Sequence, residues 1–549
     1  MTLRHDHVLR TAFLVTGALG LTAAPLSAGT LHVPGDAATI QQAINAASGG
    51  DTILVAPGTY VERIDLLGKK LIVQSTDGAA VTTINGAGGG TVVTVDDVSP
   101  PGTMLRGFTI TGGAIGTKVE AGGTSGSTVW GGGGIFVGEN SSLQIDACVI
   151  SGNTIVNPAY DVGGGVGAAQ AAVTLTGCTL TGNSAEKGSA LADMTGYSEF
   201  RLFDCTISDN MAAFPASTGS CAIFVGDGRS FMATDCFVTD NVGSGVLASG
   251  FVPRVTGCTF SGNTRWGCLA GTAVGMDLLD CNFLGNGLGG MSSSAQYANS
   301  FDIVTRCVFA NGDTLRPCGD VHVNECTFDG AQISVAPVFG TAHVVNSIAR
   351  NIASFVAGSS DVTYSNVQGG AGGTGNIDAN PQWVNAAAHD YHLLPGSPCV
   401  NAGSPAGPID GNLSVVDQGA FLLDGWDDLG GGQFATAFTG SVPHLAGQGL
   451  LVSGGTVGFA LTVMPALEPT ALIIGLSELG TGFKGGLIWP SLDLVLAGLV
   501  TDAAGNFSVA TTWPAGVPSG TTIRLQFLVQ SPTAPQGFGI SNAVRATAP

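Results

Sequence analysis

A six-residue phrase recurs through the middle of the sequence: Cys, any residue, an apolar residue, two further residues and Asn. Copies occupy residues 148–153, 178–183, 205–210, 236–241, 258–263 and 281–286, and degraded copies begin at residues 307, 326, 346 and 365. A unit of about 20 residues that lengthens by insertion is typical of one coil of a parallel β-helix. Helical repeats are longer and tolerate less Gly, Thr and Val. The repeat therefore predicts an all-β solenoid.

Apolar residues alternate within each unit. The residues five and three positions before the Cys are apolar, as Leu143 and Ile145 are before Cys148, and the residue two positions after it is apolar as well. A period of two indicates strands with one buried face. The phase breaks between these two segments, where the chain bends into its next strand. A third short strand follows a Gly-rich turn, as at residues 134–137, so we expect three strands per coil.

Stacked coils about 4.8 Å apart place equivalent residues above one another. We therefore expect three internal columns of identical side chains. The cysteines form one column and the asparagines another, at a turn where each amide can bond its neighbours and the bent backbone. The third column is aromatic, and its members are Phe260, Phe283, Phe309 and Phe328. Polar or charged substitutions in the cysteine column should be destabilising.

The chain resembles the right-handed parallel β-helix proteins of the pectin-lyase-like superfamily over residues 31–423. Residues 39–47 look like the short amphipathic helix that caps the N-terminal end, and residues 50–60 look like the first coil. Residues 380–385, 390–393, 396–403 and 417–421 resemble the closing segment of many secreted bacterial members. A solenoid needs caps because its last coil would otherwise expose unpaired edges.

The two ends of the chain differ from the repeat. Arg4 and Arg10 precede an apolar run over residues 12–26 that ends in Ser27 and Ala28, which is typical of a signal peptide. A membrane anchor is the alternative, although the run is short and contains Pro25. We expect a signal peptide at 1–28, a β-helix at 29–423, a linker at 424–433 and a β-sandwich at 434–549. The sandwich resembles domains appended to exported proteins of planctomycete-type bacteria, and the protein is expected to be secreted or at the cell surface.

The charge balance excludes some partners. The 549 residues carry a formal net charge of -21, and only 10% of them are charged. A surface of this sign repels phosphate backbones, so nucleic-acid binding is not expected. The most apolar later stretch, residues 485–500, contains Pro490 and Asp493, so we expect no membrane span in the mature chain. The oligomeric state cannot be read from the sequence.

Twelve cysteines in an exported chain would usually suggest disulfides. The Cβ atoms of equivalent residues in adjacent coils lie farther apart than the roughly 3.8 Å that separates the Cβ atoms of a disulfide. We therefore interpret the cysteines of the repeated phrase, called the ladder cysteines below, as buried thiols. Pairing among Cys221, Cys268, Cys318 and Cys399, which lie outside the column, is left open. The cysteine spacing does not suggest zinc, and no metal or other cofactor is predicted.

The position just before each ladder cysteine carries the candidate binding residues. Asp280, Arg306 and Glu325 occupy it in consecutive coils. If this corner faces solvent, it could be a strip that binds a saccharide or Ca²⁺, because carboxylates hold sugar hydroxyls and hard cations. The alternative is a solvated ladder of ion pairs that contributes little. We take Asp280, Arg306 and Glu325 as the predicted substrate-binding residues.

Known catalytic phrases of the superfamily are missing. The sequence has no Asn-Thr-Asp, Gly-His-Gly and Arg-Ile-Lys set as in polygalacturonases, no Arg-x-Pro-x-x-Arg as in pectate lyases and no Asp-Pro-His-Glu as in alginate epimerases. Asp320, His322 and Glu325 are close in sequence but need not share a face of a strand. We therefore predict a non-catalytic glycan-binding or cell-surface structural protein whose partner is extracellular polysaccharide. The alternative is a polysaccharide lyase or glycoside hydrolase acting on acidic polysaccharide, which clustered Asp, Arg and Lys in one groove would favour.

Overall fold

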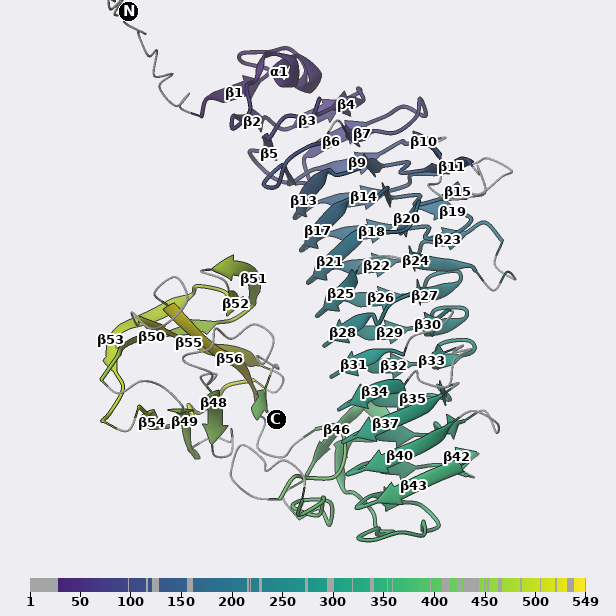
Figure 1. Cartoon of the computed structure of the whole chain (residues 1–549), viewed down its shortest axis with the longest axis vertical. Coiled ribbons are helices and arrows are strands. Elements are labelled where there is room, and N and C mark those ends of the chain that lie inside the picture. The colour runs from purple at the N-terminus through teal and green to yellow at the C-terminus, as the bar shows by residue number, and fades with distance from the viewer. Residues whose placement is uncertain are drawn as a thin grey trace, which may run out of the picture.

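A parallel β-helix makes up most of the molecule (Figure 1). The computed structural model describes residues 28–548 with short gaps, of which the largest are 121–127, 294–300, 407–414, 429–443 and 531–537. Three long parallel sheets run along the body. The first has 14 strands, from β1 (Thr30–Val33) to β43 (Ser359–Thr363), the second has 13, from β3 (Gly58–Tyr60) to β44 (Asn366–Val367), and the third has 12, from β4 (Ile64–Asp65) to β42 (Val356–Ala357). The expected signal peptide lies outside the described residues.

One coil shows how the repeat forms these sheets. In the coil of Cys178, β17 (Ala172–Thr176) belongs to the first sheet, β18 (Thr179–Thr181) to the second and β20 (Leu191–Asp193) to the third. Each pairs in register with the equivalent strand of the next coil, so that Leu175 lies beside Leu202 and Leu180 beside Ile207. The predicted three-strand coil is confirmed.

The predicted internal columns are present. The rings of Phe260, Phe283, Phe309 and Phe328 stack with centroids 4.8–5.2 Å apart and nearly parallel planes. The described cysteines are all buried free thiols, including Cys221, Cys268 and Cys399, whereas Cys318 lies outside the described residues. Ladder thiols donate to carbonyl oxygens, as Cys178 does to those of Ile145 and Thr176 at 3.4 Å.

The asparagines form a continuous chain of buried side-chain amides. Asn210, for example, donates to the Oδ1 of Asn241 at 3.0 Å and to the carbonyl of Leu180 at 2.9 Å, and its own Oδ1 accepts from Asn183. The same contacts recur from Asn153 to Asn286. Because each amide serves both its neighbours and the turn backbone, the column holds the turns of successive coils in register.

A short helix covers the N-terminal end of the β-helix (Figure 1). Helix α1 (Ile40–Ala46) is capped by Thr39, whose hydroxyl accepts a hydrogen bond from the backbone N–H of Gln42 at 3.1 Å. Its apolar face, formed by Ile40, Ala43 and Ile44, is buried on the first coils. Among the described residues, no helix has both the length and the hydropathy needed to cross a bilayer.

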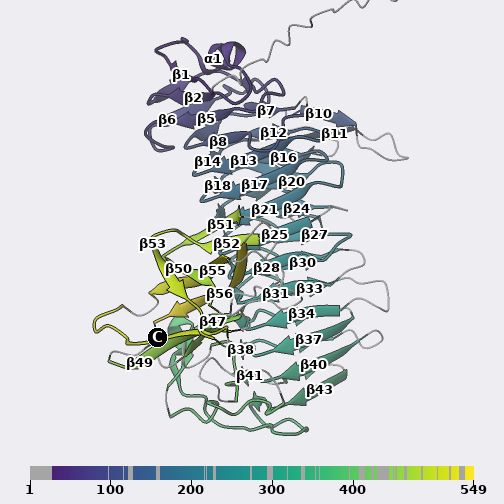
Figure 2. The same ribbon diagram turned by 60° about the vertical axis from the view of Figure 1, so that its left-hand side comes forward.

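The C-terminal domain is a β-sandwich (Figures 1 and 2). One sheet contains β47 (Trp426–Asp428), β56 (Phe538–Thr547), β55 (Thr522–Gln530), β50 (Pro469–Gly475) and β53 (Leu494–Val500), in that order. The other contains β48 (His444–Gln448), β49 (Thr456–Thr462) and β54 (Phe507–Thr512). Both sheets contribute to one apolar core, for instance through Leu461 and Phe527. Strand β47 falls in the range expected as a linker, and it pairs with β56.

Candidate functional site

The residue before each ladder cysteine forms the corner between the first and second sheets. Its backbone is left-handed in successive coils, with φ of 50° at Asp235, 64° at Gly257, 55° at Asp280, 48° at Arg306 and 52° at Glu325. Asp and Gly adopt this conformation readily, whereas Arg and Glu do so at a cost. Since every coil turns in the same way, the corner side chains are set above one another along the body.

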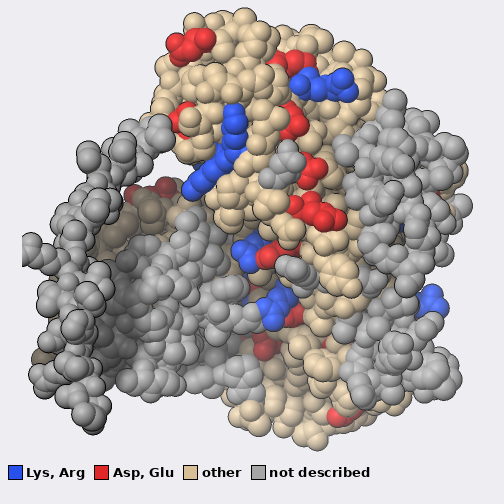
Figure 3. All heavy atoms as spheres, turned by 45° about the horizontal axis from the view of Figure 1, so that its top comes forward, with Lys and Arg blue, Asp and Glu red and all other residues tan. Residues whose placement is uncertain are grey.

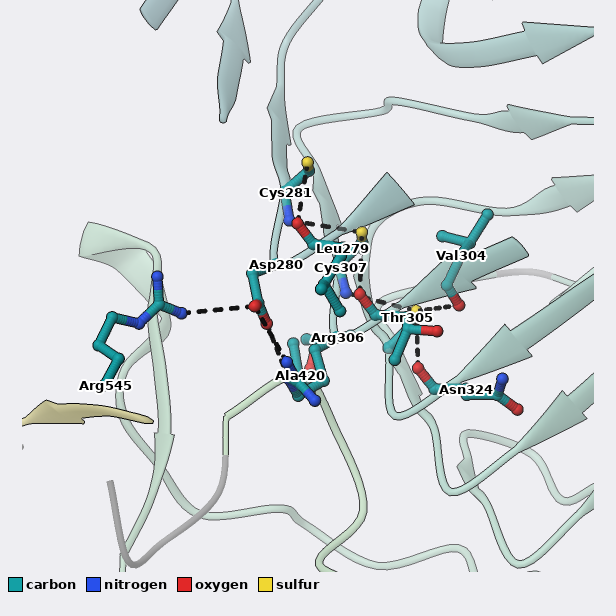
Figure 4. A network of polar contacts seen from close by, with 12 residues as sticks. Leu279, Asp280, Cys281, Val304, Thr305, Arg306, Cys307, Asn324, Ala420 and Arg545 are labelled. Carbon is teal, nitrogen blue, oxygen red and sulfur yellow. Dashed lines mark hydrogen bonds and ion pairs between the residues drawn. The ribbon is translucent and has the colours of Figure 1, made fainter. Parts of the chain in front are cut away.

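Asp280 and Arg306 are the corner residues of two consecutive coils, and they form a bidentate ion pair (Figure 4). The Nε and one terminal nitrogen of Arg306 donate to the two carboxylate oxygens of Asp280 at 2.7 and 3.0 Å. Arg545, on β56 of the C-terminal domain, approaches the same carboxylate from the other side at 3.6 Å. The carboxylate of Asp280 therefore lies between two guanidinium groups, one from each domain.

A second ion pair joins the domains two coils earlier. Arg524, on β55, donates to a carboxylate oxygen of Asp235 at 2.9 Å. The corner residue of the intervening coil is Gly257, which lines the space between the domains, and the carboxylate of Asp235 lies where a Cβ atom of residue 257 would be. The C-terminal domain thus lies against the corner and encloses a cleft between itself and the β-helix.

This cleft has a volume of about 230 Å³. Its charged lining consists of Asp280, Arg306, Arg524 and Arg545, together with His392 from the closing segment of the β-helix. Three guanidinium groups therefore line the cleft with one carboxylate, and a second carboxylate, that of Asp235, pairs with Arg524 just outside the described lining. In a chain with a net charge of -21, this excess of guanidinium groups over carboxylates in the lining favours an anionic ligand.

His392 is held in a defined orientation at the cleft. It lies on β46 (Asp390–Leu393), where its Nδ1 is 2.7 Å from Oδ1 of Asp390, and its ring stacks on Phe421 with centroids 4.4 Å apart. A carboxylate at Nδ1 fixes the ring and leaves Nε2 as the nitrogen that can meet a ligand. Phe421 also lines the cleft and gives it an apolar wall.

The predicted trio is brought together, but its corner does not face solvent as the prediction required. The side chains of Asp280 and Arg306 are only 7% and 13% exposed, because the C-terminal domain covers them. Glu325 is buried beside a second cavity, which Arg306, Asn346 and Ser404 also line. Burial raises the pKa of Glu325, and the nearby charge of Arg306 opposes that rise. Arg306 is thus the residue that the two cavities share.

The other charged residues singled out from the sequence, Asp320, His322 and Glu325, do not all share a face of the structure. His322 is exposed on the outer face of the first sheet and stacks on His343, with ring centroids 5.1 Å apart, whereas Glu325 is buried at the corner. On the face shown in Figure 3, acidic and basic side chains lie beside one another in a band rather than gathering by sign. Arg254 and Asp277 form such an exposed pair at 3.7 Å. Exposed pairs of this kind contribute little to stability.

Sequence reasoning missed Arg524, Arg545, His392 and Phe421. One signal was available for the arginines, because residues 434–549 contain only three basic residues and these are two of them. Asp390 and His392 are two apart on a strand and so share a face, which could have identified that pair. That these residues meet Asp280 and Arg306 could not be read from any spacing.

The comparisons with known proteins bear on the fold. Residues 189–368 match the family model described as the right-handed beta helix region, which confirms the right-handed parallel β-helix predicted from the sequence. No curated protein matches the chain.

A search of solved structures found chains that are similar to this one, three of which follow. A pectin methylesterase mutant in complex with a hexasaccharide is 12% identical, with 64% of this chain and 92% of that chain covered and a TM-score of 0.24. Full-length tailspike protein 2 from Escherichia coli O157:H7 bacteriophage CAB120 is 11% identical, with coverages of 95% and 68% and a TM-score of 0.25. The receptor-binding tailspike of bacteriophage Det7 is 10% identical, with coverages of 93% and 97% and a TM-score of 0.22. At these values the likenesses say nothing about the activity of this chain.

Proposed function

We propose that the chain is an exported, non-catalytic β-helix protein that binds acidic polysaccharide in the cleft between the β-helix and the C-terminal domain. The observation that carries this proposal is the charge of the cleft, which Arg306, Arg524 and Arg545 line together with one carboxylate, that of Asp280. Asp235, outside the lining, pairs with Arg524. Guanidinium groups match the planar carboxylates of uronic acids. The rings of His392 and Phe421 add the apolar surface that ligand sites usually have.

The predicted binding residues enter this proposal with different roles. Arg306 is the residue of the β-helix that would meet the ligand, and Asp280 holds its guanidinium in place. Glu325 supports Arg306 from the neighbouring cavity, so we propose no direct contact between Glu325 and the polysaccharide. Secretion or attachment to the cell surface would place the cleft where such polymers occur.

The chemistry of the cleft supports binding without hydrolysis. Glycoside hydrolysis generally uses two carboxyl groups, one as an acid and one as a base or nucleophile. Among the described lining residues Asp280 is the only carboxylate, and its charge is engaged by Arg306 and Arg545. A second carboxyl group for this reaction is therefore missing from the described lining.

Calorimetric titration tests the proposal, with oligogalacturonate as the acidic probe and a neutral glucan oligomer of the same length as its counterpart, each with and without Ca²⁺. We expect binding of the acidic oligomer only, and about tenfold weaker binding for Arg545→Gln because a charged hydrogen bond is lost. Arg254→Gln is the matched control, since Arg254 is also paired with an aspartate but lies on the exposed outer face. No binding, or equal losses in both variants, would refute the proposal.

A polysaccharide lyase is the second candidate, and the Asp390–His392 pair favours it. In such an elimination, a base removes the proton beside the uronate carboxylate, the bond to the leaving oxygen breaks, a carbon–carbon double bond forms and the leaving oxygen gains a proton. His392 could accept the first proton while the arginines neutralise the carboxylate. The same samples are therefore monitored for the ultraviolet absorbance of unsaturated products. Products that His392→Gln abolishes would establish the lyase, and binding without any product leaves the non-catalytic function standing.

A further inference from the structure

One side of the C-terminal sandwich is open along both of its sheets. Strand β53 is the edge of the five-stranded sheet and β54 is the edge of the three-stranded sheet. Of their 13 residues, 11 are exposed, 6 of 7 in β53 and 5 of 6 in β54. Leu494, Val495 and Leu496 are 48%, 47% and 41% exposed. A soluble domain rarely leaves a long apolar edge uncovered, because its backbone N–H and C=O groups are ready to pair with another strand.

The opposite side of the sandwich is closed. Edge strand β48 is joined across the sandwich to β56 by Asn542, whose side chain accepts from the N–H of Leu445 at 2.6 Å and donates to its carbonyl at 2.8 Å. The other edge of the five-stranded sheet, β47, is only three residues long. Short length is one way in which proteins protect an edge strand from pairing. The two sides of this domain therefore differ in the feature that governs strand association.

We propose that the open side is an interface between two copies of this chain, formed by antiparallel pairing of β53 with β53. Gly498 bulges with a φ of +80°, so the pairing is confined to the regular stretch from Leu494 to Ala497. A two-fold axis at Val495 sets Val495 opposite its counterpart and Leu494 opposite Leu496 of the second copy, since opposite residues of a sheet share a face. The two five-stranded sheets then become one continuous sheet, and the contact is self-complementary, as a two-fold interface requires.

Charge favours this site over other surfaces for association of two copies. Copies with a net charge of -21 repel one another, so a contact must use a neutral surface. Residues 494–500 contain no charged side chain, and Asp493 would face Ala497 of the second copy rather than another acid. In Figure 1, β53 lies on the side of the domain away from the β-helix, where a second copy can approach.

The size of the surface sets the expected strength. The two edge strands with the neighbouring exposed residues Leu467, Leu476, Leu479 and Leu492 give a smaller patch than the roughly 20–30 residues per side of a stable interface. We therefore expect a weak dimer that dissociates on dilution rather than a permanent one. The inference does not depend on polysaccharide binding.

Sedimentation velocity over a range of concentrations tests it on the mature full-length chain. We expect a monomer–dimer equilibrium that Val495→Lys weakens by at least about tenfold, because the axis brings two introduced charges close together in an apolar contact. Val252→Lys is the matched control, since Val252 is equally exposed, at 48%, but lies on the β-helix. Leu496→Lys, on the other face of β53, serves as a second disrupting variant.

The outcomes are distinct. Dissociation in both β53 variants, with an unchanged dimer in Val252→Lys, supports the interface. A monomer at every concentration overturns it, and so does a dimer that neither β53 variant weakens. Near-ultraviolet circular dichroism of each variant shows whether the sandwich is still folded. If Val495→Lys unfolds the domain, the result for Leu496→Lys decides.

Discussion

Asn286 donates two hydrogen bonds to Asp313, one from its backbone N–H at 2.9 Å and one from its side-chain amide at 3.0 Å. The ladder of asparagines therefore ends on a carboxylate in the next coil. Asp313 is fully buried, and burial raises its pKa to about 6, against the effect of the hydrogen bonds that it accepts. The charge of the group that ends the asparagine column therefore depends on pH.

Replacing the carboxylate of Asp313 by an amide should stabilise the protein at alkaline pH. Because the pKa of Asp313 is raised on folding from 3.8 to about 6, its stabilising contribution is complete below about pH 4 and is lost as the pH rises through 6. Asp313→Asn does not ionise and can continue the ladder, so we expect a gain of roughly 1–3 kcal/mol at pH 8 and little change at pH 4. Guanidinium unfolding at both pH values measures this, with the exposed Asp361→Asn as control. A loss at pH 8 would contradict the assignment.

Replacing an asparagine inside the column should destabilise the protein strongly. Asn210→Ala removes the acceptor of the backbone and side-chain N–H groups of Asn183 and the donor to the carbonyl of Leu180. Buried groups left without partners should cost roughly 2–4 kcal/mol in the free energy of unfolding. Asn282→Ala changes an amide that points outward on the neighbouring sheet and should cost well under 1 kcal/mol. Equal unfolding midpoints for the two variants would show that the amide ladder does not hold the turns together.

The aromatic column can be tested in the same way. Phe283 is fully buried and stacks on Phe260 at 5.2 Å and on Phe309 at 4.8 Å. Phe283→Ala leaves a cavity between two rings and should cost about 3–5 kcal/mol. The control is Phe237→Ala on the outer face, where the ring is 55% exposed and its loss should change stability by less than about 1 kcal/mol. Similar melting temperatures in calorimetry would argue against an internal stack.

The sequence predicted the β-helix well because its information is local and repeated. The Cys and Asn of each phrase, and rings such as that of Phe283, recur at equivalent positions, so one coil implies the next. The corner was located correctly too, but not its surroundings. Asp235 meets Arg524 across 289 residues of sequence, and no periodicity encodes a contact between two domains. Only the folded arrangement shows that the corner is covered and that a cleft results.

The last prediction concerns the reactivity of the thiols. The described cysteines are buried and unpaired, and burial raises the pKa of Cys148 and Cys221 to about 12. The thiolate is the reactive form, so a neutral buried thiol should not react with an aromatic disulfide reagent at pH 8. We expect labelling of these cysteines only in denaturant, with the same number of labels whether or not the protein has first been reduced. Peptide mapping by mass spectrometry assigns each label and separates Cys318 from the described cysteines. Rapid labelling of ladder thiols in the native protein, or a label count that rises after reduction, would show that the sulfurs are exposed or paired.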